Sequence, residues 1–126
     1  MKRKAFWLGA ALVSLIALIA LIAGGVLRPN AVFAARYPVH GVDVSAYQGN
    51  IDWTVLSEGL DFAFIKATEG SGAADAYFAA NFAGAAEAGL LAGAYHFFSF
   101  ESPGETQAEN FIRTAGSLSG RLPPVV

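Results

Sequence analysis

The sequence contains no cysteine. This absence excludes disulfide bonds and thiolate metal sites, because both need a cysteine sulfur. It does not exclude export from the cytoplasm, since a domain with a sufficient hydrophobic core folds without disulfides. At 126 residues the chain is long enough for one modest domain.

Positive charge is scarce in the larger part of the chain. All ten acidic residues lie beyond residue 35. The basic residues in the same part are Arg36, Lys66, Arg113 and Arg121. Phosphate binding needs a cluster of lysine and arginine side chains, which this part of the chain lacks. The composition therefore argues against a nucleic-acid partner.

Metal-binding and phosphate-binding patterns are also missing. The two histidines, His40 and His96, are far apart in sequence, and no group of His, Asp and Glu has the spacing of metal ligands. The nearest approach to a phosphate loop is "EGSG" (69–72), which lacks both the G-x-G-x-x-G spacing and a lysine. We therefore expect no metal and no cofactor.

A long stretch near the N-terminus carries no charge. The basic tripeptide "KRK" (2–4) is followed by an uncharged, mostly apolar run over residues 5–27. A bilayer span needs about 20 such residues, whereas the apolar region of a cleaved signal peptide has ~7–15. Residues 1–34 are therefore predicted to form a single-pass signal anchor, with residues 5–27 in the lipid bilayer, the N-terminus in the cytoplasm and the rest outside. The alternative is a signal peptide that is cleaved near Ala34, which gives a secreted protein.

From residue 35 on, strand-like and helix-like stretches alternate. The predicted strands are 40–47, 61–70, 90–98 and the terminal "PPVV" (123–126); the predicted helices are 50–59, 75–89 and 102–116. Strands that alternate with helices over short connections favour parallel pairing with right-handed crossovers. The pattern therefore predicts an α/β fold.

Polar residues are predicted to cap the starts of the three helices. Asp52 and Asp75 precede the first two, and Ser102 precedes the third, with Pro103 next and Glu105 three residues after it, as in a capping box. The apolar stripes expected to face the sheet are Phe78, Phe82 and Ala85 in the second helix and Ala108, Phe111, Ile112 and Ala115 in the third.

Polar side chains gather at the carboxyl ends of the predicted strands. Asp43 lies at the end of the first strand, Lys66 and Glu69 at the end of the second, and Tyr95 and His96 near the end of the third. In parallel α/β folds this edge carries the chemistry. The aromatic residues nearby are Tyr47, Phe97 and Phe98. Sugar C–H faces pack on aromatic rings and carboxylates accept hydrogen bonds from hydroxyls, so the edge suits a carbohydrate.

Several of these residues have a structural alternative. Asp43 is the candidate catalytic residue, but an aspartate also suits the turn that follows it. Glu69 either contacts the substrate or pairs with Lys66. Tyr95 and His96 are adjacent in one strand, so their side chains point to opposite faces. Tyr95 is predicted to face the sugar, whereas His96 is either a site residue or a packed histidine.

Five segments resemble, in order and spacing, the first half of a glycoside hydrolase family 25 domain. They are "GVDVSAYQGNIDW" (41–53), "FAFIKATEG" (62–70), "AGLLAGAYHFF" (88–98), "QAENF" (107–111) and "LPPVV" (122–126). This is the Chalaropsis-type lysozyme family, which cleaves the β-1,4 bond between N-acetylmuramic acid and N-acetylglucosamine in peptidoglycan. One departure is Ala73, where the family usually has a bulky residue.

The resemblance implies a fold and a set of roles. Residues 35–126 would form an incomplete, TIM-like β/α barrel of about three and a half βα units. Asp43 would be a supporting active-site carboxylate. The substrate-binding residues would be Tyr47, Glu69, Tyr95 and His96. The partner would be a peptidoglycan glycan strand, and the protein would act as a monomer.

The resemblance also implies that an acid is missing. In the family the strand that begins "PPVV" continues into an Asp-x-Glu motif, whose glutamate is the general acid and would lie beyond Val126. Hydrolysis requires a protonated carboxylic acid, and within this chain only Glu69 is placed to substitute for it. We therefore expect the chain as written to be a truncated, inactive form. The alternatives are a membrane-anchored, non-catalytic glycan-binding module and an anchored remnant without a ligand.

Overall fold

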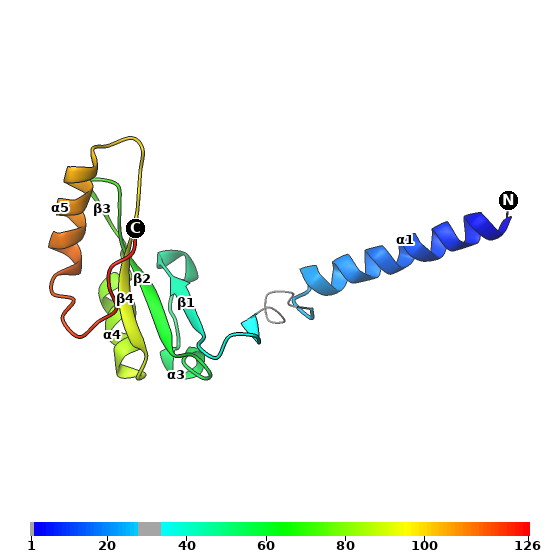
Figure 1. The fold of residues 1–126 in the computed structure, drawn as a ribbon, viewed down its shortest axis with the longest axis horizontal. Helices are drawn as coiled ribbons and strands as arrows, with labels where there is room; N and C mark the ends of the chain where they lie inside the picture. The colour runs from blue at the N-terminus through cyan, green and yellow to red at the C-terminus, as the bar shows by residue number, and fades with distance from the viewer. Residues whose placement is uncertain (1, 28–33) are drawn as a thin grey trace. The chain divides into compact units, whose positions relative to one another are not determined.

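The computed structural model describes residues 2–27 and 34–126, which form two units, 1–38 and 39–126. The first unit contains helix α1 (Lys2–Ala23), shown in Figure 1. Its segment Phe6–Ala23 is long and apolar enough to cross a membrane, judged by length and composition. Most of the predicted cleavage region lies outside the described residues.

The second unit is built on a sheet whose central strand is β2 (Phe62–Glu69). Strands β1 (Gly41–Val44) and β4 (Leu91–Phe97) pair with β2 in parallel, as the alternating pattern predicts. A two-residue strand, β3 (Ala73–Ala74), folds back antiparallel on the end of β2 and was not predicted. The "EGSG" segment is the turn of this hairpin, and Gly70 takes its positive φ of 55° there. The predicted fourth strand is reduced to one parallel bridge between Tyr95 and Val125.

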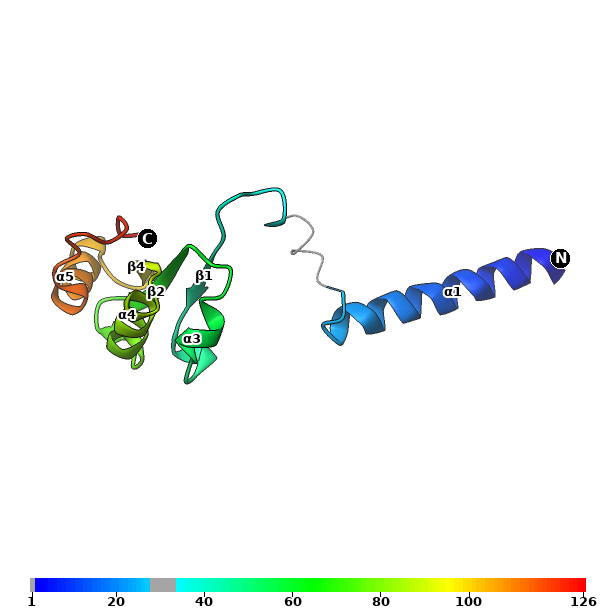
Figure 2. The same cartoon turned by 90° about the horizontal axis from the view of Figure 1, so that it is seen from below.

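One face of this sheet, the helix face, forms the hydrophobic core. Its members are Val44, Ala63, Ile65, Ala92 and Ala94. Alanine on neighbouring strands leaves room for the larger side chains Trp53, Phe78 and Leu90 that pack against them. Figure 2 shows α3 (Trp53–Leu56) and α4 (Phe78–Glu87) together on one side of the strands. The stripe predicted for α4 is confirmed, since Phe78 and Ala85 are buried and Phe82 packs against the core.

The opposite face of the sheet, the open face, carries Asp43, Phe62, Phe64, Lys66 and Tyr95. The parallel register places Asp43 beside Phe64 and Lys66 beside Tyr95. Because side chains alternate between the two faces along a strand, these residues share the side that α4 does not cover.

The helix starts differ from the predictions in two of three cases. Asp52 caps α3 as predicted, and its carboxylate accepts hydrogen bonds from the amides of Thr54 (3.0 Å) and Val55 (3.3 Å). Helix α4 begins only at Phe78, so Asp75 does not cap it. Helix α5 (Gly104–Ala115) has Pro103 at its N-cap without a side-chain cap.

The capping box predicted from Ser102 is therefore wrong. The carbonyl of Ser102 accepts a hydrogen bond from the side-chain amide of Gln107 at 2.7 Å. Ser102 thus serves as a backbone acceptor ahead of the helix, and the helix begins two residues later, at Gly104.

The predicted inward stripe of α5 is also partly wrong. Ala108 and Ile112 are exposed, whereas Gln107 and Asn110 are almost completely buried. The amide nitrogen of Asn110 donates to the carbonyls of Gly70 (3.0 Å) and Ala73 (3.1 Å), which ties α5 to the β2–β3 hairpin. Phe111 and Ala115 of the predicted stripe do pack against the core, so these hydrogen bonds add to apolar contacts in holding the helix.

Gln107 makes the larger set of bonds. Its amide nitrogen donates to the carbonyls of Ser99 and Ser102, so its oxygen is the acceptor for the amide of Ser99 and for His96 Nε2. His96 Nε2 must therefore carry the hydrogen, and Nδ1 accepts from the Thr68 hydroxyl at 2.8 Å. The network fixes the tautomer of a histidine that is only 5% exposed.

Gln107→Leu removes an acceptor from His96 and Ser99 and a donor from two carbonyls. We expect the free energy of unfolding to fall by about 2–4 kcal/mol, because buried polar groups are left without partners. Urea unfolding followed by Trp53 fluorescence in a Trp7→Phe background measures this. The control is Glu109→Leu, an exposed position on the same helix, with an expected change within about 0.5 kcal/mol. Equal effects of the two variants would contradict the assigned role.

Two glycines leave room for phenylalanine rings on the open face. A Cβ added at Gly93 would overlap the Phe64 ring and would lie 3.0 Å from Cβ of Leu122; a Cβ at Gly41 would overlap the Phe62 ring. These are close approaches that only glycine permits.

Gly93→Ala is expected to destabilise the domain by about 1–3 kcal/mol, because the Phe64 ring must leave its position. Gly72→Ala is the matched control, since nothing lies within 4 Å of the added methyl group. Adding Phe64→Leu to Gly93→Ala should recover part of the loss, and thermal unfolding of these three variants and of Phe64→Leu alone tests this. Strict additivity of the two substitutions would count against the contact.

Candidate functional site

Asp43 and Tyr95 come together on the open face near the carboxyl ends of β1 and β4. They line one pocket of about 270 Å³ together with Phe64 and Val125. Asp43 is exposed and Tyr95 is half-buried, so the carboxylate and the phenol both border an accessible space.

Tyr95 stays protonated in this pocket at neutral pH. Burial and the negative charge of Asp43 raise the pKa of Tyr95 above its ordinary value, although the charge of Lys66 and a hydrogen bond with Ser45 oppose this. The phenol is therefore a hydrogen-bond donor next to a carboxylate that accepts.

Lys66 and Glu69 form the ion pair that the sequence allowed as an alternative. The Lys66 ammonium donates to Oε2 of Glu69, with Lys66 buried and Glu69 exposed. Burial alone would lower the pKa of Lys66, but the hydrogen bond and the charge of Glu69 outweigh it and raise that pKa. Lys66 therefore carries its charge on the open face.

Two aromatic rings flank the Lys66 ammonium. Its Nζ lies 4.9 Å from the ring centre of Phe97 and 6.0 Å from that of Tyr47. These cation–π contacts hold both rings beside the Lys66–Glu69 pair. The sequence placed Phe97 among the nearby aromatic residues but gave it no role in the site. The alternation of β4 could have assigned it, because Phe97 and Tyr95 are two positions apart in that strand.

Tyr47 is the middle residue of a short 3₁₀ turn, η1 (Ala46–Gln48), that directly follows β1. The Ser45 hydroxyl accepts from the Tyr47 amide at 3.3 Å, and the Gln48 side chain accepts from the Ser45 amide at 2.7 Å. This reciprocal capping orders the turn. The Tyr47 side chain is nevertheless 91% exposed, so its ring is presented to solvent.

His96 does not join the other four predicted site residues. It lies on the helix face, where both ring nitrogens are bonded to Thr68 and Gln107 and the rings of Phe98 and Phe111 lie 6.4 and 6.3 Å away. The opposite orientation of Tyr95 and His96 is thus confirmed, and the packed-histidine alternative describes His96.

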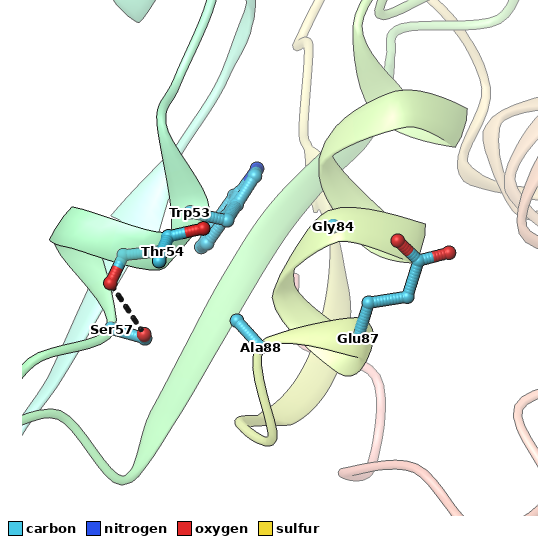
Figure 3. Close-up of a pocket in the computed structure, with 6 residues that line it drawn as sticks. All are labelled: Trp53, Thr54, Ser57, Gly84, Glu87 and Ala88. Carbon is cyan, nitrogen blue, oxygen red and sulfur yellow. Dashed lines mark hydrogen bonds between the residues drawn. The ribbon is translucent and has the colours of Figure 1, made fainter.

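A second cavity, of about 340 Å³, lies between α3 and α4 (Figure 3). Figure 3 shows the Trp53 side chain reaching from α3 toward Gly84 of α4, with Ser57 bonded to the carbonyl of Thr54. Glu87 is the acidic residue that lines this second cavity. The second cavity shares no lining residue with the Asp43–Tyr95 pocket. Among residues 2–27 and 34–126, no group of three His, Asp or Glu side chains is placed to hold a metal ion.

The open-face site offers a set of contacts that suits a sugar. Asp43 and Glu69 are acceptors, Tyr95 is a donor, and the exposed rings of Tyr47 and Phe97 offer flat apolar surfaces. Pyranose rings need both kinds of contact, because hydroxyl groups surround a ring with C–H faces.

The chain is similar in sequence and in structure to several known proteins. Lysozyme M1 of Streptomyces globisporus is 47% identical over 83 residues, which cover 64% of this chain and 28% of that protein. The N,O-diacetylmuramidase of Chalaropsis sp is 38% identical over 90 residues, covering 65% and 41%. The structure of a family 25 glycosyl hydrolase from Bacillus anthracis matches with a TM-score of 0.68 and 52% identity, covering 71% of this chain and 42% of that one.

The chain thus spans less than half the length of these relatives. Within that span, residues 42–126 match the sequence profile described as Glycosyl hydrolases family 25. The chain belongs to glycosyl hydrolase family 25.

Proposed function

We propose that the protein is a peptidoglycan hydrolase that cleaves the β-1,4 bond between N-acetylmuramic acid and N-acetylglucosamine. The observation that carries this proposal is the pocket shared by Asp43 and Tyr95 on the open face, beside the exposed rings of Tyr47 and Phe97. The relatives called lysozyme and N,O-diacetylmuramidase support it.

The residues would have distinct roles. Asp43 would be a supporting carboxylate near the scissile bond, and Tyr95 a hydroxyl donor to the sugar beside it. Tyr47 would stack on a pyranose ring. Glu69, held by Lys66, would accept hydrogen bonds from the glycan. His96 would act by fixing β4 to α5, away from substrate.

Residues 35–126 would form the first part of a β/α barrel and would supply about three and a half of its βα units. The open face of the sheet would be the interior of that barrel. The parallel register and the match to family 25 structures support this. A general acid would come from a part of the fold other than the described residues. No cofactor is needed for such a reaction, because two carboxyl groups or one carboxyl group with substrate assistance suffice.

Residues 1–34 would act as an export signal that holds the domain at the outer side of the membrane, as a monomer, with residues 5–27 in the bilayer. The length and apolarity of α1 support this. A cell-wall substrate requires such a location. Cleavage near Ala34 and secretion is the alternative.

A non-catalytic glycan-binding module is the second candidate. Both oxygens of Asp75 accept backbone amides, and Glu69 is paired with Lys66. Both carboxylates are thus already engaged as acceptors, which favours a binding module over a hydrolase. Release of reducing ends from peptidoglycan distinguishes a hydrolase from a binding module, which retains glycan without cutting it.

Tyr47→Ala and Asp43→Asn are expected to weaken retention of the full chain on purified, insoluble peptidoglycan. Loss of a stacking ring or of an oriented acceptor should lower the affinity by about 5–30-fold. Cosedimentation in detergent measures retention, and a reducing-end assay on the same samples detects cleavage.

Tyr37→Ala is the matched control, because Tyr37 is an exposed tyrosine that lies in the other unit of the chain. Its retention should equal that of the unsubstituted chain. Retention that none of the three substitutions changes would place any glycan contact elsewhere on the protein.

Leu15→Arg combined with Ile19→Arg tests the anchor. Each arginine near the centre of a membrane helix costs about 2.5–3.5 kcal/mol on insertion scales, so the double variant should leave the membrane fraction. Glu109→Arg, on the domain surface, should stay membrane-bound like the unsubstituted chain. A soluble protein that begins near residue 35, found by mass spectrometry, would contradict the anchor and support cleavage.

A further inference from the structure

Asp75 connects the η1 turn, which carries Tyr47, to the central strand β2. It lies between β3 and α4 and is half-buried. Its Oδ2 accepts the Ala46 amide at 2.8 Å, across 29 positions of sequence, and its Oδ1 accepts the Tyr77 amide at 3.0 Å. Bonds from amides to a carboxylate are among the stronger hydrogen bonds in proteins.

The backbone of Asp75 is itself held by the central strand. Its amide donates to the carbonyl of Ala67 at 2.9 Å. Ala67 lies in β2 at the irregularity where the pairing with β4 shifts register, between Lys66 and Thr68. Asp75 is therefore fixed to β2 by its backbone and to the turn η1 by its side chain.

The turn needs such a contact. The ladder between β1 and β2 ends at the pair Val44–Ile65, so the residues that follow Val44 have left the sheet. Ala46 is the first residue of η1, and the amides at the start of a helical turn have no partner within it. Ser45 and Gln48 order the turn internally, whereas Asp75 joins it to another part of the domain.

We propose that Asp75 is a positioning residue that holds the η1 turn, and with it the Tyr47 ring, at a fixed place beside Lys66 and Phe97. This inference rests on the proposed function only in its consequence for glycan binding. The charge of Asp75 also reaches the site, since it raises the pKa of both Lys66 and Tyr95. Asp75 acts through Ala46 and does not touch the glycan.

The test compares Asp75→Ala with Asp52→Ala in the full chain in detergent micelles. Asp52 is the matched control, because its carboxylate also accepts two backbone amides but only within its own helix. Amide hydrogen exchange at Ala46 should become at least about ten-fold faster in Asp75→Ala and should not change in Asp52→Ala. If Asp75→Ala does not fold, Asp75→Asn replaces it in the test, because it keeps the size of the side chain and one acceptor oxygen. Its exchange rate at Ala46 should be faster than that of the unsubstituted chain by less than the factor expected for Asp75→Ala.

A double-variant cycle with Tyr47→Ala separates positioning from direct contact. Asp75→Ala should weaken retention on purified peptidoglycan as much as Tyr47→Ala does, and the combined variant should be no weaker. Additive losses would mean that Asp75 contacts the glycan itself, and unchanged exchange at Ala46 would mean that it does not hold the turn; either result overturns the proposal. If the unsubstituted chain is not retained, the proposed function fails, and exchange at Ala46 alone decides the role of Asp75.

Discussion

The parallel register of β2 with β1 and β4 is the constraint on which the site depends. It sets Asp43 beside Phe64 and Lys66 beside Tyr95, and so decides which side chains share the open face. A slip of one residue would turn Tyr95 toward the helices and His96 toward the pocket. The register is held because Ala63, Ile65 and Ala67 of β2 are fully buried in the core, whereas a slip of one residue would place Phe64 and Lys66 there.

Helix α5 is held by buried polar contacts in addition to the packing of Phe111 and Ala115, whereas the buried face of α4 is mainly apolar. Buried amide side chains are costly unless every donor and acceptor has a partner, and Gln107 and Asn110 find theirs in backbone carbonyls and amides of the sheet and its loops. Such bonds specify position more sharply than apolar packing does. The position of α5 matters to the site because Gln107 bonds His96, the neighbour of Tyr95 on β4.

The sequence was sufficient for the three longer strands, β1, β2 and β4, and for the two faces of β4, but not for β3 or for the single bridge at Val125. Apolar runs with a two-residue alternation predict strands, and they place Tyr95 and His96 on opposite sides without further information. The Lys66–Glu69 pair was also foreseen as an alternative, from spacing alone.

Long-range polar contacts could not be predicted in this way. The bonds from Asp75 to Ala46 and from Asn110 to Gly70 join residues far apart in the chain, and no periodicity encodes them. The prediction that Asp75 caps a helix was locally sensible, because aspartate often does so. It failed because the carboxylate found an amide in another element. The stripe predicted for α5 was right for Phe111 and Ala115 and wrong for Ala108 and Ile112, because periodicity counts apolar residues and two of the positions buried in this helix are the polar residues Gln107 and Asn110.

Three carboxylates on or near the open face, Asp43, Glu69 and Asp75, differ in the groups that surround them and therefore in what they can do. Glu69 faces an ammonium, Asp75 has an amide hydrogen on each oxygen, and Asp43 borders the pocket with the phenol of Tyr95. Glycosidic cleavage needs a group that gives a proton to the leaving oxygen. Tyr95 holds a proton, but its raised pKa makes it a weak acid, and Glu69 and Asp75 are engaged as acceptors. The described residues thus place Asp43 and Tyr95 at one pocket as acceptor and donor, whereas Glu69 and Asp75 are engaged by partners of their own.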